Sequence, residues 1–168
     1  MNIELFPLDK VMIDGVSICL GAGRAEVEAK IGEGERIKNK NYYYGSEMRI
    51  DFDSSDRVEF IEFLGGIDGK LRPMIYGVSA FEFKADELVE LLKHENSGEI
   101  DDSERGYSYG FINIGVGVYR SRIPDDIEDM IEDAEEDGEE LDDEDIEFER
   151  RKADHWATIG IGVKNYYR

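Results

Sequence analysis

Five oxygen-bearing side chains between residues 51 and 62 have the spacing of a calcium-binding loop. They are Asp51, Asp53, Ser55, Glu59 and Glu62, at loop positions 1, 3, 5, 9 and 12. The sharp turn of such a loop needs glycine at position 6, where this chain has Asp56. The flanking residues alternate between apolar and polar, as strands do, whereas helices should flank a calcium loop. A surface hairpin with outward-pointing acids explains the same residues, so we predict no metal site here.

A glycine-containing turn, GAGRAE at residues 21–26, is the nearest approach to a nucleotide-binding motif. It follows the apolar run 16–20 and opens a predicted helix, as the phosphate-binding turn of a dinucleotide fold does. Glu26 stands where the third glycine belongs, and a predicted hairpin follows where a parallel strand is required. Because a tight loop leading into a helix needs the same glycines, we predict no cofactor.

No group of residues has the pattern of a nucleophile or a metal centre. His94 and His155 have no second histidine at helical ligand spacing, and no serine lies in a nucleophile elbow. Cys19 is the only cysteine and lies between Ile18 and Leu20, where we expect a core thiol. A single cysteine forms no internal disulfide, which favours a reducing compartment. We predict that the chain is not an enzyme, and acid–base catalysis by two carboxylates is the least favoured hypothesis.

The chain has a formal charge of −21, and one segment supplies most of it. Residues 125–149 hold 17 Asp and Glu and no Lys or Arg, so the remaining 24 acids and 20 bases leave only −4 elsewhere. Such a surface repels nucleic acid and anionic membranes, and neither is expected as a ligand. The N-terminal MNIELFPLDK lacks the features of a signal peptide, and no run approaches the roughly 20 apolar residues of a membrane span. We therefore predict a cytoplasmic protein with a basic protein as its partner.

Two stretches of the chain have the same order of predicted elements. IDGVS at residues 13–17 and IYGVS at 75–79 are 62 residues apart, and predicted helices follow at 24–31 and 85–93. Strands are predicted at 42–44, 48–52 and 58–64 in the first stretch, and at 107–109, 112–118 and 157–163 in the second. We predict an α+β fold with an antiparallel sheet and short helices on one face. Its two tandem repeats, residues 1–70 and 71–168, would form one compact domain.

An acidic insertion at residues 121–155 precedes the last predicted strand. Pro124 suits the first position of a helix, and Ile127, Met130, Ile131 and Ala134 then recur with helical spacing. Gly138 ends this helix, and a second is predicted from 142 to about 153, with acids first and bases last. We expect an acidic helical segment docked by one apolar stripe. The alternative is a solvated, disordered loop, since long runs of like charge are often disordered.

Two surfaces are candidates for binding a partner. The first is the acidic face of the insertion, because its 17 acids exceed the net charge of about 2–8 that keeps a small domain soluble. Its predicted contact residues are Asp129, Glu132, Asp133, Glu135, Glu136, Glu139 and Glu140. The second is a flat shelf formed by Gly115, Gly117, Gly160 and Gly162 and bordered by Tyr107, Tyr109, Tyr119 and Tyr166. Either a partner lies on that shelf with the tyrosines as anchors, or an internal helix or aromatic ring packs there.

Residues 15–32, GVSICLGAGRAEVEAKIG, resemble the opening of a known helix-then-sheet repeat. Gly21, Glu26, Val27 and Gly32 carry the match, and NYYYG, MRIDFD and RVEFIEF continue it. Such repeats build the β-lactamase inhibitor protein and the outer-membrane lipoprotein assembly factors, and similar tandem units occur in immunity proteins of bacterial contact-delivered toxins. The resemblance covers residues 11–64, and reaches 75–163 only through the internal repeat. It implies an antiparallel sheet with helices on one side and inhibition of enzymes by surface complementarity. The chain departs from the lipoprotein group in lacking a lipid-attachment cysteine, and the acidic insertion is foreign to the family pattern.

These observations lead to one principal hypothesis and one alternative. The chain is expected to be an immunity or inhibitor protein that binds and neutralises a basic toxin through its acidic surface, and a nuclease is the toxin class that this surface suits. The alternative is a general acidic interaction module that recruits a basic host protein without inhibiting it. Neither hypothesis requires a cofactor or a metal.

Overall fold

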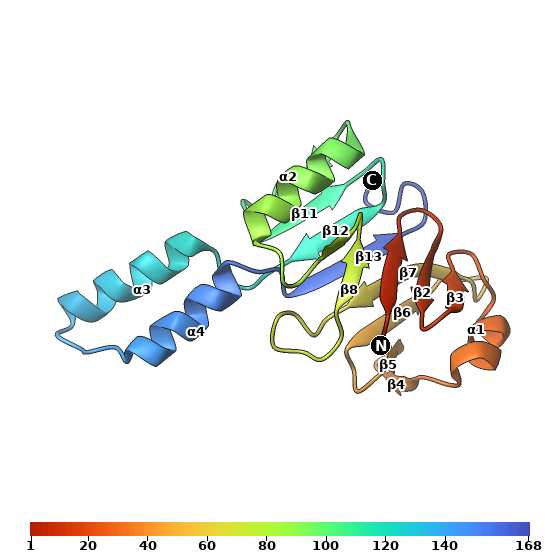
Figure 1. Ribbon diagram of the computed structural model, residues 1–168, viewed down its shortest axis with the longest axis horizontal. Helices are drawn as coiled ribbons and strands as arrows, with labels where there is room; N and C mark the ends of the chain where they lie inside the picture. The colour runs from red at the N-terminus through yellow and green to blue at the C-terminus, as the bar shows by residue number, and fades with distance from the viewer.

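The computed structural model describes all of residues 1–168 (Figure 1). Two sheets and two helices enclose its hydrophobic core. The smaller sheet has the strand order β3 (Val16–Cys19), β2 (Lys10–Ile13), β1 (Ile3–Phe6), β8 (Pro73–Ile75) and β9 (Val78–Ser79). Its strands are antiparallel except at the β1–β8 pair. This sheet was not predicted, because strands of two to four residues are too short to show a clear alternation.

The larger sheet has eight strands and is antiparallel throughout. Its order is β10 (Ile100–Asp101), β11 (Ser108–Phe111), β12 (Val116–Tyr119), β13 (Thr158–Gly162), β7 (Val58–Phe63), β6 (Met48–Phe52), β5 (Lys40–Tyr43) and β4 (Glu35–Ile37). The predicted α+β class is confirmed. The predicted strand over 112–118 is wrong in its first half: residues 112–115 form a turn between β11 and β12, in which Gly115 has a φ of +64°.

The two halves of the chain contribute to the larger sheet in mirrored order. Outward from the central β13–β7 pair, strands β12, β11 and β10 on one side correspond in order to β6, β5 and β4 on the other. The turns at residues 14–15 and 76–77 also match, since both have φ values of +47° and +82°. The order of elements is therefore the same in both halves, and a duplicated origin stays a prediction.

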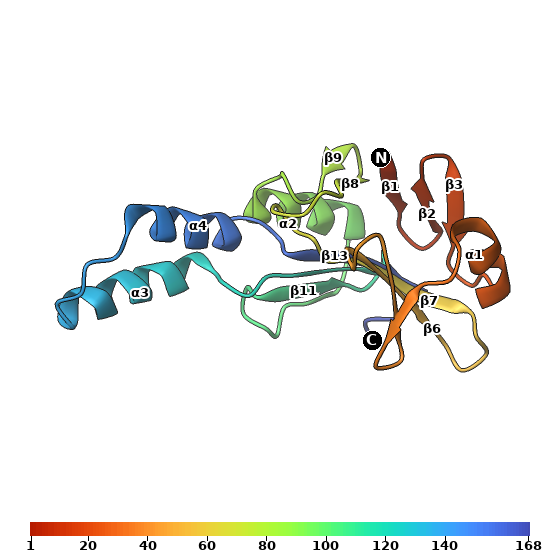
Figure 2. The same cartoon turned by 90° about the horizontal axis from the view of Figure 1, so that it is seen from below.

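Helices α1 (Arg24–Ile31) and α2 (Ala85–Asn96) begin at the predicted residues, and α2 ends three residues later than predicted. α2 buries Leu88, Val89 and Leu92, whereas α1 buries only Val27. Figure 2 shows α2 and the five-stranded sheet on one side of the eight-stranded sheet and the C-terminus on the other. One hydrophobic cluster of 26 buried residues joins both sheets and both helices.

The opposite face of the eight-stranded sheet is covered by the chain's own aromatic rings. Gly110, Gly117 and Gly160 are aligned across neighbouring strands, and Tyr167 lies over the first two of them. Phe60 fills the space above Gly160 and stacks on Tyr166, with 4.6 Å between ring centroids. Of the two alternatives for the glycine shelf, the structure shows internal aromatic rings, so the shelf is not open to a partner. Sequence periodicity does not reveal that the last three residues fold back over the sheet.

Substitution Gly117→Ala is expected to detach the C-terminal segment. A Cβ at this position would lie 2.0 Å from the Tyr167 hydroxyl oxygen, so the ring must leave its site. We expect a loss of about 1–3 kcal/mol in the free energy of unfolding, measured by urea denaturation, together with sharpened Tyr167 ring signals in NMR spectra. Gly23→Ala is the matched control, because its Cβ would meet nothing within 4 Å. Equal losses from the two substitutions would contradict the packing described here.

Candidate functional site

The acidic insertion is a helical hairpin that projects from the body of the protein (Figures 1 and 2). It consists of α3 (Pro124–Glu136) and α4 (Asp143–Ala153) and lies between β12 and β13. In the other half of the chain the corresponding strands, β6 and β7, are joined only by the turn at residues 53–57. The predicted helical insertion is confirmed, and we call residues 121–155 the arm.

The apolar stripe of α3 packs within the arm instead of docking the arm on the body. Ile127 and Ala134 are buried, while Met130 and Ile131 are partly exposed. Helix α3 makes its main contacts with α4, and neither helix has comparable contacts with a strand. Docking of the stripe on the body was therefore a wrong expectation, because the second helix already covers it. The arm is left free of the sheets beyond its root.

A buried arginine and a buried tryptophan join the arm to the body. Arg120 donates hydrogen bonds from Nε to the Gly106 carbonyl at 2.9 Å and from Nη1 to the Ala153 carbonyl at 2.6 Å. Its guanidinium lies 4.6 Å from the centre of the Trp156 ring, and burial lowers its pKa. Trp156 is fully buried and donates from Nε1 to the Ala85 carbonyl at 2.9 Å. Arg120 precedes α3 and Ala153 is the last residue of α4, so this network fixes both ends of the arm.

The start of α3 is held by Asp126. This carboxylate accepts a hydrogen bond from the Ile123 backbone N–H at 3.0 Å and another from the Tyr107 hydroxyl at 2.8 Å. These bonds, the first above all, lower the pKa of Asp126, and the bond to the carboxylate raises the pKa of Tyr107. The carboxylate thus satisfies a free N–H group at the helix start. Tyr107 therefore orients the arm and does not border a binding shelf.

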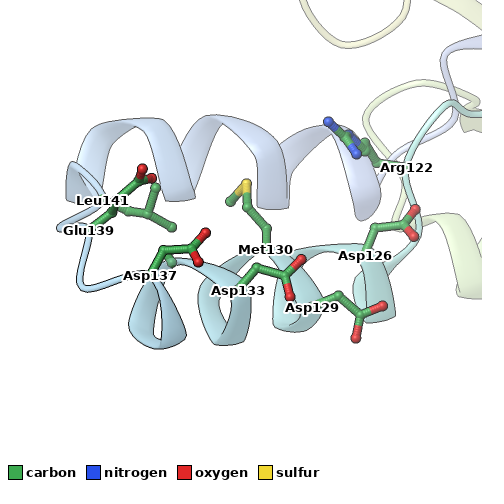
Figure 3. Close-up of a pocket in the computed structure, with 9 residues that line it drawn as sticks. Arg122, Asp126, Asp129, Met130, Asp133, Asp137, Glu139 and Leu141 are labelled. Atoms are coloured by element: carbon green, nitrogen blue, oxygen red, sulfur yellow. The ribbon is translucent and has the colours of Figure 1, made fainter.

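A groove of about 410 Å³ runs along α3 from Arg122 to the α3–α4 loop (Figure 3). It carries four aspartates, spaced three or four residues apart so that they form one line along the helix: Asp126, Asp129, Asp133 and Asp137. Met130, Ala134 and Leu141 are its apolar lining, and Arg122 is its one cationic residue. The groove therefore offers carboxylates beside an apolar strip.

The predicted contact residues do not form one surface. Asp129, Asp133 and Glu139 line the groove. Glu132, Glu135, Glu136 and Glu140 are exposed outside it. Tyr109 faces the core, where its ring lies at right angles to Trp156 with 5.8 Å between centroids, whereas Tyr119 is 47% exposed on the opposite face of the sheet. In the register of β11 with β12, Tyr109 pairs with Val118, and consecutive strand residues point to opposite faces, so Tyr109 and Tyr119 do not border one shelf.

Sequence reasoning missed the residues that hold the arm in place. Arg120 comes directly after β12, and Trp156 is the only tryptophan of the chain. The single tryptophan directly after a charged segment could have indicated a buried anchor at the end of that segment, because large aromatic residues usually pack in a core. Nothing in the local sequence indicates that Arg120 is buried, with only 4% of its surface exposed.

The charge density of the arm matches that of duplex DNA. Residues 124–153 contain 17 acids and the three bases Arg150, Arg151 and Lys152, which leaves −14. The 13 residues of α3 span about 20 Å at 1.5 Å per residue. One net charge therefore falls on about every 1.4 Å of the hairpin, against about 1.7 Å along the DNA axis. A protein surface evolved to bind DNA would meet a comparable field here.

The other candidate sites have structural roles. In the calcium-like segment, Asp51 is buried in ion pairs with Arg49 at 3.1 Å and Lys40 at 3.4 Å, and Asp53 accepts hydrogen bonds from two backbone N–H groups of its turn. In the glycine turn, Gly21 donates its backbone N–H to the Val58 carbonyl at 2.8 Å. No group of three His, Cys, Asp or Glu side chains is placed to hold a metal ion.

The expected burial of Cys19 is wrong. Its neighbour Ile18 points into the core, so Cys19 points to the outer side of the smaller sheet and is partly exposed. His94 is exposed on α2, and His155 lies at the root of the arm with its Nδ1 2.7 Å from the Arg151 carbonyl oxygen. None of the four helices has the length and apolar composition needed to cross a membrane.

The chain matches no family model, no curated protein sequence and no solved structure.

Proposed function

We propose that this chain is an inhibitor or immunity protein that binds a basic protein through the arm and blocks that protein's nucleic-acid-binding surface. The single observation that carries the proposal is the net charge of −14 on residues 124–153, mounted on one projecting hairpin. Its density is close to that of the polyanion that a nuclease binds, so a cationic substrate groove would attract the arm as it attracts DNA.

The arm carries more like charge than its own folding favours. Asp129, Asp133 and Asp137 are four residues apart along α3, and so are Glu128, Glu132 and Glu136. Each such pair of like charges destabilises a helix by about 0.2–0.5 kcal/mol. No base lies in the last turn of α3, where cations would be favourable. A cationic partner would relieve this repulsion, which supports binding over solubility as the use of these residues.

The root of the arm supports inhibition in particular. Arg120 and Trp156 connect both ends of the hairpin to the core, so the arm is presented in one orientation. A pre-oriented arm loses less conformational entropy on binding than a disordered acidic tail. It can also insert into the substrate groove of the partner. The β-lactamase-inhibitor-like repeat proposed from the sequence would supply the same rigid support.

Affinity capture followed by an activity assay tests this proposal. The chain would be immobilised, exposed to extract of its native cells and eluted with rising salt, and the eluted basic protein would be assayed for nuclease activity. We expect the activity to fall to the baseline at one equivalent of added chain. Salt-dependent binding without any loss of activity would favour the recruiting module instead, and the absence of salt-dependent capture would contradict both proposals.

A further inference from the structure

A shallow apolar hollow of about 650 Å³ lies between β9 and α2. Tyr76, Val78, Phe83 and Leu91 line it, and all four are partly exposed. β9 is the last strand of the smaller sheet, so no further strand covers the hollow from that side. All four pack against the hydrophobic core with one part of the side chain and expose the remainder to the hollow.

Leu91 packs against the edge of the core and is not one of the buried residues that hold α2 in place. Leu88, Val89 and Leu92 are buried at 5% exposure or less and already form the inward face of α2. Leu91 lies to one side of that face, next to the residues of β9. A partly exposed leucine beside three other partly exposed apolar side chains provides a contact surface for another molecule.

Carboxylates line the α2 side of this hollow, and no Lys or Arg lines it. Asp86, Glu87 and Glu90 form the rim on the α2 side, and all three are exposed. Glu90 pairs with Lys93 at 3.4 Å and Asp86 lies 3.9 Å from Arg120, yet their side chains stay 74% and 88% exposed. An apolar side chain with basic neighbours complements this combination of lining and rim.

The hollow begins where the arm ends. The Ala85 N–H at the start of α2 donates to the carbonyl of Asp154 at 2.7 Å, and Lys84 pairs with the Asp154 carboxylate at 3.7 Å. Figure 2 shows α4, α2 and β9 following one another on the same side of the molecule. We propose that the hollow is a second contact site, which takes an apolar side chain flanked by Lys or Arg on the same basic partner. This inference rests on the proposed function and names the kind of segment that the partner must present.

Two peptides of equal charge test the hollow separately from the arm. One is an amphipathic helix of lysine and leucine, and the other has every leucine replaced by glutamine. Fluorescence anisotropy at about 0.15 M salt would give both dissociation constants. We expect the full chain to bind the leucine peptide about tenfold more tightly, roughly the effect of burying one leucine side chain. Leu91→Gln should bring the ratio close to one, while Ile37→Gln, at an exposed apolar residue on the far edge strand β4, should leave it unchanged.

Each outcome separates the two proposals. If the ratio of the two peptides' dissociation constants stays about tenfold in both Leu91→Gln and Val78→Gln, the proposal of a second contact site is overturned. A dimer that forms in sedimentation experiments and is lost in Leu91→Gln would overturn it in favour of a second copy of the chain. Reversal of arm carboxylates should weaken both peptides equally and keep the ratio. If that reversal weakens neither peptide, the proposed function itself fails, whatever Leu91 does.

Discussion

Reversal of four arm carboxylates, in a variant with Glu132, Asp133, Glu135 and Glu136 all changed to lysine, is expected to lower the association rate constant about 100-fold at low salt. All four are exposed on α3, so the change alters the field around the arm without disturbing buried groups. Steering by charge raises association rates by about 10–1,000-fold, and it acts on the encounter more than on dissociation. Stopped-flow measurements with the captured basic partner would give both rate constants.

A control variant must have the same net charge as the reversed arm. Substitution of lysine for Asp9, Glu26, Glu33 and Glu35 also replaces four exposed acids, but these lie on the body, away from the arm. When both variants are compared at physiological salt, we expect this control to change the association rate constant by less than about tenfold, because charges beyond the Debye length of about 8 Å are screened. The steep dependence of the rate on salt should persist in the control and disappear in the arm variant. Equal effects of the two variants would show that net charge, and not the arm, attracts the partner.

Substitution Trp156→Ala is expected to cost about 4 kcal/mol in the free energy of unfolding. The side chain is fully buried, and its removal leaves a cavity under Arg120 and Tyr109. The carbonyl of Ala85 also loses its indole N–H donor. In a chain of 168 residues this corresponds to a fall in Tm of about 10 °C. Urea denaturation followed by circular dichroism would measure it.

Trp156→Phe separates packing from hydrogen bonding at the root of the arm. It keeps an aromatic ring for the Arg120 guanidinium but removes the N–H group, so we expect a loss of only about 1–2 kcal/mol. Phe148→Ala is the matched control, because Phe148 is 44% exposed on α4 and its loss should cost less than about 1 kcal/mol. If Trp156→Ala were no more costly than Phe148→Ala, the root would not hold the arm as described.

The sequence predicted those elements whose cause is local. The α3 helix follows from Pro124 and from apolar residues at helical spacing, and α2 follows from its leucines, because neighbours three and four residues apart meet on a helix wherever it lies. The strands β5, β6 and β7 follow from an alternation within a few residues. The charge of residues 125–149 is a matter of composition alone.

The tertiary structure decided what depends on residues far apart in the chain. Parallel pairing of β1 with β8 brings residues 3–5 beside 73–75 and creates a second sheet that no local pattern indicates. The register of β11 with β12 decides that Tyr109 packs on Trp156 while Tyr119 stays exposed. Tyr167 covers Gly110 and Gly117 because the C-terminal segment returns across the sheet.

The arm, too, has features with a local cause and features that depend on residues far apart in the chain. The acids and the two helices of the arm could be predicted from residues 121–155, whereas its projection from the body could not. That projection depends on whether the stripe of Ile127 and Ala134 packs on the sheets or on α4, and the two choices present the same local pattern. Arg120, 33 residues from Ala153 in the chain, holds the chosen arrangement through one buried hydrogen bond. Composition alone thus determined that the chain carries a polyanionic segment, and long-range packing decided that this segment is a helical arm projecting from the body, since only the folded core brings its two ends together.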